Sequence, residues 1–140
     1  MQKPFVWNLR VYWEDTDAGG VIYHSNYLNF FERARTEWLR SLDIHQSLLK
    51  EKHNLVFGIR KMDIDFLQAG RLDDELQVSV HSVSTGGTRI SFCQEMIRKE
   101  DGVKLAEASV VAVCLAADIF RPLRLPDWIR SKIDNAEQEK

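Results

Sequence analysis

The sequence predicts an α+β domain in which an antiparallel sheet wraps around one long central helix. Residues 27–42 carry apolar side chains at helical spacing, whereas residues 55–116 mostly alternate between apolar and polar side chains, as strands do. Glycine-containing turns separate the alternating segments, so we expect neighbouring strands to run antiparallel. A helix of roughly 18 residues is about 27 Å long, which is close to the length of such strands. One sheet can therefore cover one helix.

The chain begins with a predicted strand and a shaped loop. Residues 5–13 favour a strand because aromatic and β-branched side chains are frequent there. Residues 14–20 read Glu-Asp-Thr-Asp-Ala-Gly-Gly and interrupt this pattern. Carboxylates that accept hydrogen bonds from nearby amides, followed by glycines that tolerate positive φ, are typical of an ordered loop.

The strongest helix signal follows this loop. Its apolar stripe consists of Tyr27, Phe30, Phe31, Ala34, Trp38, Leu39 and Leu42. Charged residues fill the positions between them, so we expect Arg33, Arg35, Glu37 and Arg40 to be exposed, with Arg33 pairing with Glu37. Ser25 is the predicted N-cap. A shorter helix is expected over residues 45–52.

Four further strands are predicted over residues 55–66, 75–83, 89–98 and 104–116, with hairpin turns at residues 85–88 and 99–102. The last strand is apolar at both alternating sets of positions, which predicts a central strand with the helix on one side and other protein on the other. A short helix should start near Asp127, and the polar tail from Asn135 should fray. The partly apolar outer face of the sheet predicts at least a dimer.

Length and charge limit the possible classes of protein. The 140 residues fit a single domain spanning 1–140, with a tail at about residues 135–140. A net charge of −2 gives no basic field for nucleic acid or an anionic membrane. The longest apolar run, residues 110–117, is too short for a transmembrane segment, and no signal peptide is evident, so we expect a cytoplasmic protein. Cys93 and Cys114 should be reduced.

Residues 15–24 are the strongest candidate for a chemical site. They place Asp17 in a glycine-rich loop immediately before a helix N-terminus. The free amides and positive dipole of such a terminus can polarise a carbonyl and stabilise an oxyanion. A carboxylate beside it can act as a nucleophile or as a general base for water. A thiol, with a pKa of about 8.5, leaves readily as thiolate, so thioester hydrolysis is one option among several.

Three other interpretations of this loop compete with catalysis. Asp15 and Asp17 resemble the start of a calcium loop, but Gly19 and Asn26 occupy its fifth and twelfth positions, which disfavours calcium. A transition-metal site built on His24 and Asp17 lacks a third ligand at suitable spacing. A purely structural loop, in which the carboxylates only accept local hydrogen bonds, stays open. The remaining histidines are predicted to be solvated: His45, His53 and His81.

The stretch RVYWEDTDAGGVIYH from Arg10 to His24, continuing through Tyr27 and residues 31–37, closely resembles the YbgC-type acyl-CoA thioesterases. Further matches lie at residues 60–62, 69–74 and 121–126, so the resemblance covers nearly the whole chain. These proteins belong to the 4-hydroxybenzoyl-CoA thioesterase group of the hotdog-fold superfamily and are associated with the Tol-Pal system. The resemblance implies a hotdog fold, a homo-oligomer (dimer or homotetramer) with active sites at the dimer interface, and hydrolysis of acyl-CoA.

The resemblance also implies roles for individual residues. Asp17 would be the catalytic carboxylate, His24 would contribute its backbone amide and its side chain, and Asp15 would brace the loop. Trp13 stands where the family usually has tyrosine, so a role for a phenol hydroxyl does not transfer, whereas packing against substrate does. The predicted substrate-binding residues are Trp13, Gly20, Val21, Tyr23, Arg60, Lys61, Thr88 and Arg89.

No metal and no separate cofactor are expected, because coenzyme A is part of the substrate. Acyl carrier protein is a further candidate partner. The alternative function is a weakly catalytic or non-catalytic module that binds acyl carrier protein or a Tol-Pal component.

Overall fold

A computed structural model describes residues 4–138 of the chain. The elements follow in the order β1 (Phe5–Arg10), η1 (Trp13–Asp15), α1 (His24–Ser41), α2 (Gln46–His53), β2 (Leu55–Phe66), β3 (Glu75–Gly86), β4 (Arg89–Arg98), β5 (Lys104–Ala116) and α3 (Asp127–Gln138). The strands form one antiparallel sheet in the order β1-β3-β4-β5-β2. The predicted α+β class is confirmed.

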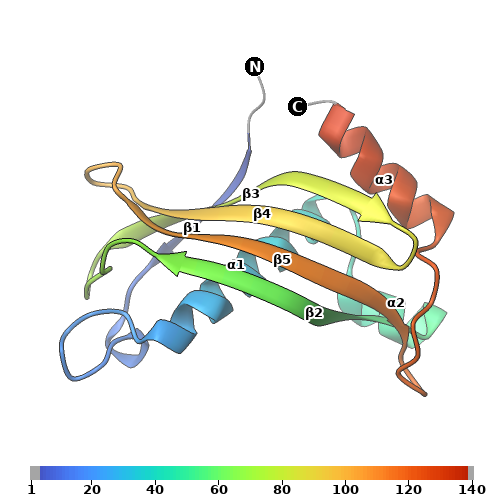
Figure 1. Cartoon of the computed structure of the whole chain (residues 1–140), viewed down its shortest axis with the longest axis horizontal. Coiled ribbons are helices and arrows are strands. Elements are labelled where there is room, and N and C mark those ends of the chain that lie inside the picture. The colour runs from blue at the N-terminus through green and yellow to red at the C-terminus, as the bar shows by residue number, and fades with distance from the viewer. Residues whose placement is uncertain (1–3, 139–140) are drawn as a thin grey trace.

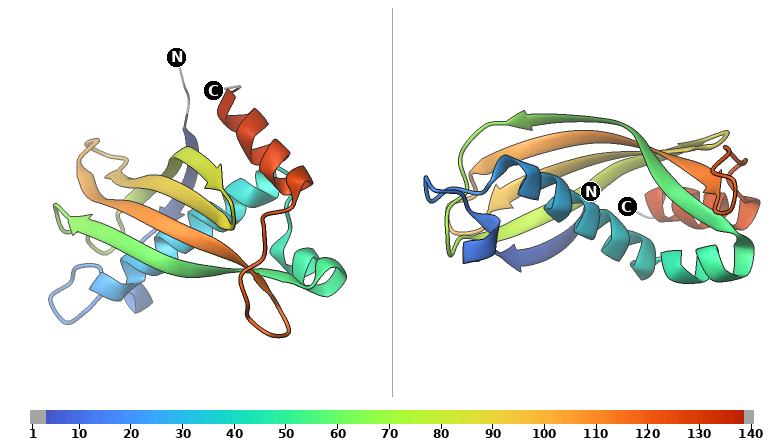
Figure 2. Two further views of the ribbon diagram at one scale, coloured as in Figure 1. Left: turned by 45° about the vertical axis from the view of Figure 1, so that its right-hand side comes forward. Right: turned by 90° about the horizontal axis from the view of Figure 1, so that it is seen from below.

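The long helix α1 crosses one face of the sheet, and the sheet curves around it (Figures 1 and 2). Its buried residues are Tyr27, Phe30, Phe31, Ala34, Arg35, Trp38 and Leu39. The Trp38 ring meets the Phe92 ring edge-on, with the centroids 5.8 Å apart. The apolar stripe predicted from the sequence is therefore the surface that joins α1 to the sheet.

Arg35 contradicts the prediction of an exposed charged face. It is buried, and its Nη1 donates to Gln94 Oε1 at 3.0 Å. Gln94 Nε2 donates in turn to the Phe31 carbonyl at 3.0 Å, so both side chains have partners inside the core. Burial lowers the pKa of Arg35 to about 10. The guanidinium thus stays charged at neutral pH but is held by hydrogen bonds.

The helix start and the surface pairing of α1 also differ from expectation. Tyr23 is the N-cap instead of Ser25, because the loop places residue 24 already in helical conformation. No side-chain hydrogen bond caps the helix there. On the exposed side, Glu37 pairs with Arg40 at 2.6 Å instead of with Arg33.

The predicted central position of the last strand is confirmed, and cover of its outer face by other protein stays a prediction. Strand β5 lies between β4 and β2, and its side chains alternate between buried and half-exposed. Valine and alanine occupy both sets of positions, which concealed the alternation in the sequence. The two edge strands are β1 and β2, and the register of β2 against β5 shifts between Ile59 and Lys61.

The last described element, helix α3, is longer than expected. Helix α3 continues past Asn135 to Gln138, while residues 139–140 of the predicted tail lie outside the described residues. Over the described part of the chain, no helix is long and apolar enough to cross a membrane. Both cysteines are free thiols, Cys93 half-buried and Cys114 buried.

Candidate active site

The loop between η1 and α1 is closed by backbone hydrogen bonds. The Asp17 N–H donates to the Val21 carbonyl at 2.9 Å, and the Gly20 N–H donates to the Asp17 carbonyl at 3.0 Å. Gly20 has φ of +78°, a conformation that costs little only for glycine. The Ile22 N–H donates to the Gly70 carbonyl at 2.8 Å, which ties the loop to the segment after β2.

Asp17 presents one carboxylate oxygen outward. Its Oδ1 accepts a hydrogen bond from the Gly19 N–H at 2.8 Å, which orients the side chain. Within residues 4–138 the other oxygen, Oδ2, has no hydrogen-bond partner, and the residue is exposed. A carboxylate held in one orientation with a free oxygen can act as nucleophile or base.

Asp15 has the opposite environment, although it lies only two residues away. It is buried, and its Oδ2 accepts from the Tyr12 N–H at 2.9 Å while its Oδ1 accepts from Asn26 Nδ2 at 3.1 Å. Its carbonyl accepts from the Tyr23 N–H at 2.8 Å. Asp15 thus joins η1 to the first turn of α1, in agreement with the bracing role expected for it.

The start of α1 offers unpaired donors. His24 is the first residue of the helix, and in the described chain its backbone N–H has no hydrogen-bond acceptor. The positive end of the helix dipole lies at the same point. The His24 side chain is exposed, with its ring centroid 4.4 Å from that of Tyr23.

Asp17 and His24 line the same open cleft, with a volume of about 350 Å³. The complete lining is Asp17, Val21, Ile22, His24, Tyr27, Phe66, Leu67, Gln68 and Ala69. The Tyr27 hydroxyl accepts from the Gly70 N–H at 3.2 Å, and the Tyr27 ring packs edge-on against Phe66. A carboxylate and helix-start amides therefore share a cleft with an apolar wall, which suits a polar acyl centre attached to an apolar chain.

The structure brings only part of the predicted set to this cleft. Val21 lines it together with Asp17 and His24, and Gly20 forms the adjacent turn. Trp13 is 79% exposed and is not among the lining residues, and Tyr23 is not among them either.

The predicted basic contacts lie elsewhere in the same chain. Arg60, Lys61 and Arg89 line a separate hollow of about 220 Å³ together with Val111. Thr88 lies in the neighbouring hairpin, where its carbonyl accepts from the Cys114 N–H at 2.8 Å. Their assignment to the substrate stays a prediction.

Sequence reasoning missed the far wall of the cleft, residues 66–69 and Tyr27. Tyr27 is predicted in the apolar stripe and in the family match, without a role in the site. A buried hydroxyl requires a hydrogen-bond partner, and that requirement is the signal that could have placed it there. Residues 67 and 68 carry no periodic or motif signal, and residue 69 belongs to a family match to which no site role was assigned. Among the described residues, no group of three or more His, Cys, Asp or Glu side chains is placed to hold a metal ion.

Comparison with known proteins gives consistent matches. Residues 11–133 match the thioesterase-like superfamily model. The acyl-CoA thioesterase YbgC of Haemophilus influenzae is 40% identical over 94% of this chain and 95% of its own length. The acyl-CoA thioester hydrolase YbgC of Escherichia coli is 42% identical over 89% of this chain and 92% of its own length.

Solved structures give the same result for the fold. A probable thioesterase from Bartonella henselae is 33% identical and superposes with a TM-score of 0.82 over 89% of this chain and all of its own. A 1,4-dihydroxy-2-naphthoyl-CoA thioesterase from Synechocystis, 23% identical, superposes with a TM-score of 0.84 over 98% of this chain and 97% of its own.

Proposed function

The chain belongs to the thioesterase-like superfamily and to its YbgC family, and from this membership we propose that it hydrolyses acyl-CoA to the free acid and coenzyme A. The observation that carries the proposal is the pairing, in one cleft, of the free Asp17 carboxylate oxygen with the uncapped start of α1 at His24. The alternative of a non-catalytic binding module gives no reason for an oriented carboxylate beside unpaired amides.

The reaction follows from these two groups. The thioester carbonyl oxygen would accept a hydrogen bond from the His24 N–H, so the negative charge that develops on it is stabilised. Asp17 then either attacks the carbonyl carbon itself or removes a proton from a water that attacks. In both routes a new C–O bond forms, the C–S bond breaks, and coenzyme A leaves as thiolate. Direct attack gives an acyl-aspartyl anhydride that water hydrolyses in a second step.

A second copy of the chain is proposed to complete the site. Strand β2 is an edge strand of 12 residues, and pairing with a second β2 would satisfy its free backbone groups. In an antiparallel pairing centred on the C-terminal half of β2, Arg60 and Lys61 of one strand would lie beside the end of the other strand, where Phe66 lines the cleft. Basic side chains would then reach the coenzyme phosphates from the neighbouring subunit.

The remaining features of the proposal are supported by the family alone. We expect a cytoplasmic homotetramer that is linked to the Tol-Pal system, with acyl carrier protein as a candidate partner. Pull-down of acyl carrier protein by the Asp17→Asn variant would test that partner separately from turnover.

Release of coenzyme A thiol tests the proposal directly. Acyl-CoA esters from short to long, and aromatic, are offered to the wild type and to Asp17→Asn. We expect the variant to lose about 10²–10⁴-fold in kcat, as removal of a general base or nucleophile does. Its thermal unfolding should be unchanged, because asparagine keeps the oxygen that accepts from Gly19. Equal thiol release by both proteins would overturn the assignment of Asp17.

A further inference from the structure

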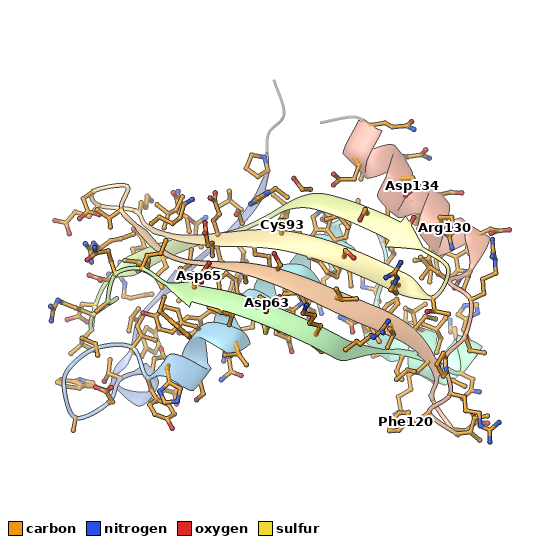
Figure 3. All side chains as sticks on the ribbon, viewed as in Figure 1. Asp63, Asp65, Cys93, Phe120, Arg130 and Asp134 are labelled. Carbon is orange, nitrogen blue, oxygen red and sulfur yellow. The ribbon has the colours of Figure 1, made fainter. Side chains whose placement is uncertain are left out.

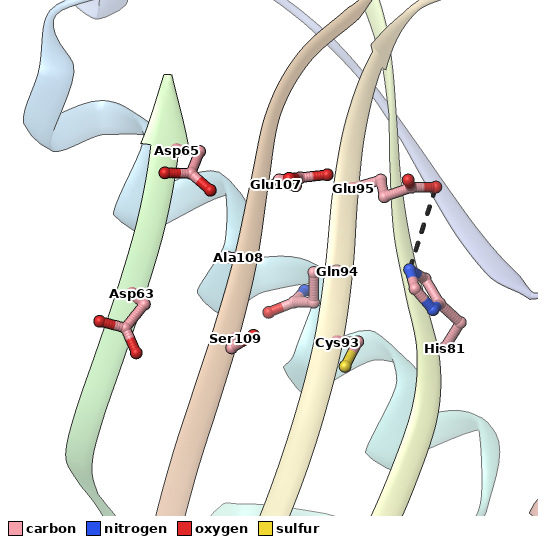
Figure 4. Close-up of a pocket in the computed structure, with 9 residues that line it drawn as sticks. All are labelled: Asp63, Asp65, His81, Cys93, Gln94, Glu95, Glu107, Ala108 and Ser109. Atoms are coloured by element: carbon pink, nitrogen blue, oxygen red, sulfur yellow. Dashed lines mark ion pairs between the residues drawn. The ribbon is translucent and has the colours of Figure 1, made fainter. Parts of the chain in front are cut away.

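Two hollows on opposite faces of the sheet differ in charge. The hollow on the outer face, which faces away from α1, has a volume of about 260 Å³ and is lined by carboxylates (Figures 3 and 4). These belong to Asp63, Asp65, Glu95 and Glu107. Lys104 contacts Glu95 at 2.5 Å and Glu107 at 3.2 Å. The outer hollow is therefore acidic, and a cation of the same chain already lies beside its carboxylates.

The inner hollow lies between α1 and the sheet and has a volume of about 160 Å³. Most of its wall is apolar and comes from α1, β2, β4 and β5: Leu39, Phe57, Ile59, Ile90, Phe92 and Ala112. A cavity of about 150 Å³ with a lining of this kind is large enough to bind benzene. The inner hollow therefore has room for one ring or for a short branched chain.

Arg35 brings a positive charge to this apolar hollow. The residue is 7% exposed and lines the hollow, and its Cζ lies 6.0 Å from the centre of the Phe92 ring. Its Nη1 donates to Gln94 Oε1, which is an uncharged acceptor. Within residues 4–138, Nε and Nη2 have no hydrogen-bond acceptor, and no carboxylate lies within ion-pair distance of the guanidinium. Buried cations normally have an anionic partner, because burial removes their hydration.

Glu32 does not supply this counter-charge. It lines the hollow but is exposed, and its Oε2 accepts a hydrogen bond from the Thr36 hydroxyl at 3.1 Å. Burial lowers the pKa of Arg35 to about 10, and the attraction of Glu32 opposes this shift without cancelling it. Water screens an exposed carboxylate. The guanidinium therefore stays charged at neutral pH, and the donor pair of Nε and Nη2 stays free.

The inner hollow is separate from the cleft at Asp17. The two have no lining residue in common in the described chain. From His24 to Arg35, helix α1 advances by roughly 16 Å along its axis. A short acyl group held at Asp17 does not span that distance. A ligand of the inner hollow is therefore a separate molecule or the far end of a long acyl group.

We propose that the inner hollow binds the carboxylate of a small organic acid on Arg35, with the apolar part of the acid against Ile90 and Phe92. A carboxylate has two oxygens at a spacing that matches the Nε and Nη2 donors, and it provides the missing counter-charge. The volume limits the apolar part to about the size of a benzene ring. Binding itself does not depend on the proposed function. That the ligand belongs to the chemical class of the hydrolysis product, a free carboxylic acid, rests on the proposed function.

Titration with para-fluorobenzoate, followed by fluorine NMR, tests the proposal. Para-fluorobenzamide is the matched control ligand, since it has the same shape and no charge. We expect the wild type to bind the amide at least about tenfold more weakly than the benzoate, as loss of a charge-assisted hydrogen bond implies. Arg35→Met should lose at least about tenfold in affinity for the benzoate and bind both ligands equally. Arg33→Met changes an exposed arginine of the same helix and should bind the benzoate as the wild type does.

Two further variants separate the charge of the hollow from its shape. Glu32→Gln keeps an acceptor for the Thr36 hydroxyl and removes the negative charge, so it should bind the benzoate more tightly. Thr36→Leu narrows the hollow and leaves Arg35 in place, so it should weaken the binding of both ligands. Circular dichroism confirms that each variant is folded. Should Arg35→Met not fold, these two variants make the test.

Other results overturn the proposal. Equal affinity of the wild type for the two ligands, or unchanged benzoate affinity in a folded Arg35→Met, would show that Arg35 does not bind the carboxylate. Weaker benzoate binding by Glu32→Gln would contradict the assigned charge. Loss of binding in Arg89→Met, but not in Arg35→Met, would place the anion in the hollow beside Val111.

Turnover distinguishes the two sources of the carboxylate. Dodecanedioyl-CoA and dodecanoyl-CoA have the same chain length, and only the first has a second carboxylate. If Arg35→Met raises KM for the dicarboxylic ester alone, the hollow receives the far end of a long acyl group. If it raises neither KM, the hollow receives a free acid. Absence of thiol release from both esters by the wild type, with benzoate binding intact, would contradict the proposed function and support the carboxylate site.

Discussion

The polar groups near the start of helix α1 and those in its middle differ in hydrogen bonding and in burial. At the start, the His24 N–H and Asp17 Oδ2 face an open cleft without partners in the described chain. In the middle, Arg35 and Gln94 are buried, and each has its partner. The polar groups at the N-terminal start of α1, where substrate is proposed to bind, are therefore free of protein partners in the described chain. Those in its middle, where the helix packs on the sheet, are hydrogen-bonded.

The difference separates two uses of polar groups. A buried group without a partner costs stability, so the core keeps only groups that are hydrogen-bonded. An exposed group without a partner costs little, since water binds it, and it remains available to a ligand. Changes at the helix start should therefore alter turnover, and changes in the middle should alter the free energy of unfolding. Substitutions at the two places test this expectation.

Arg35→Ala should have the largest effect on stability. It removes the donor to Gln94, leaves a cavity, and should lower the free energy of unfolding by about 3 kcal/mol. Arg35→Met refills the cavity and should cost about half as much. Urea unfolding measures both, and kcat per folded molecule should stay within about twofold. A large fall in kcat with unchanged stability would show that Arg35 belongs to the site.

Asp15→Ala should have the second-largest effect on stability. The Tyr12 N–H and Asn26 Nδ2 would both lose their acceptor, for about 2 kcal/mol of unfolding free energy. Because Asp15 positions the Asp17 loop, kcat should fall as well. Asp15→Asn, which keeps one acceptor oxygen, should recover part of both losses. If Asp15→Ala unfolds at the wild-type urea concentration, its bracing role is excluded.

The sequence predicted those parts of the molecule that depend on local pattern. Strands β2 and β4 begin and end at the predicted residues, because alternation and turn residues are local signals. Arg35 was misassigned because a charge between apolar helix positions normally faces solvent, and its partner Gln94 lies 59 residues away in the chain. The loop motif identified Asp17 and His24, whereas residues 66–69 join the cleft through long-range contacts of Ile22 and Tyr27 with Gly70 and of Tyr27 with Phe66.

Gly20→Ala should have a smaller effect on stability, and Gly102→Ala is its matched control. Gly20 and Gly102 have φ of +78° and +73°, and a Cβ at either would meet no atom within 4 Å. Each alanine should therefore cost only backbone strain, about 1–2 kcal/mol. Thermal unfolding should shift equally in both, while thiol release should fall only in Gly20→Ala. Equal kcat in the two variants would mean that the turn does not position Asp17.

The smallest effect on stability should come from a change in the ion pair of Arg98 with Asp101, which is more exposed than the buried pair of Arg35 with Gln94. The hydrogen bond from Arg98 lowers the pKa of Asp101 below its ordinary value. The carboxylate therefore binds protons less readily in the folded state, so its stabilising effect is present above the ordinary aspartate pKa and is lost as pH falls through the lowered pKa. Asp101→Asn should reduce the unfolding temperature slightly at pH 7, by less than Gly20→Ala does, and the difference should vanish in strong acid. In 1 M salt at pH 7 the difference should also shrink, whereas that of Arg35→Ala should persist, because screening acts on exposed charges and much less on buried ones.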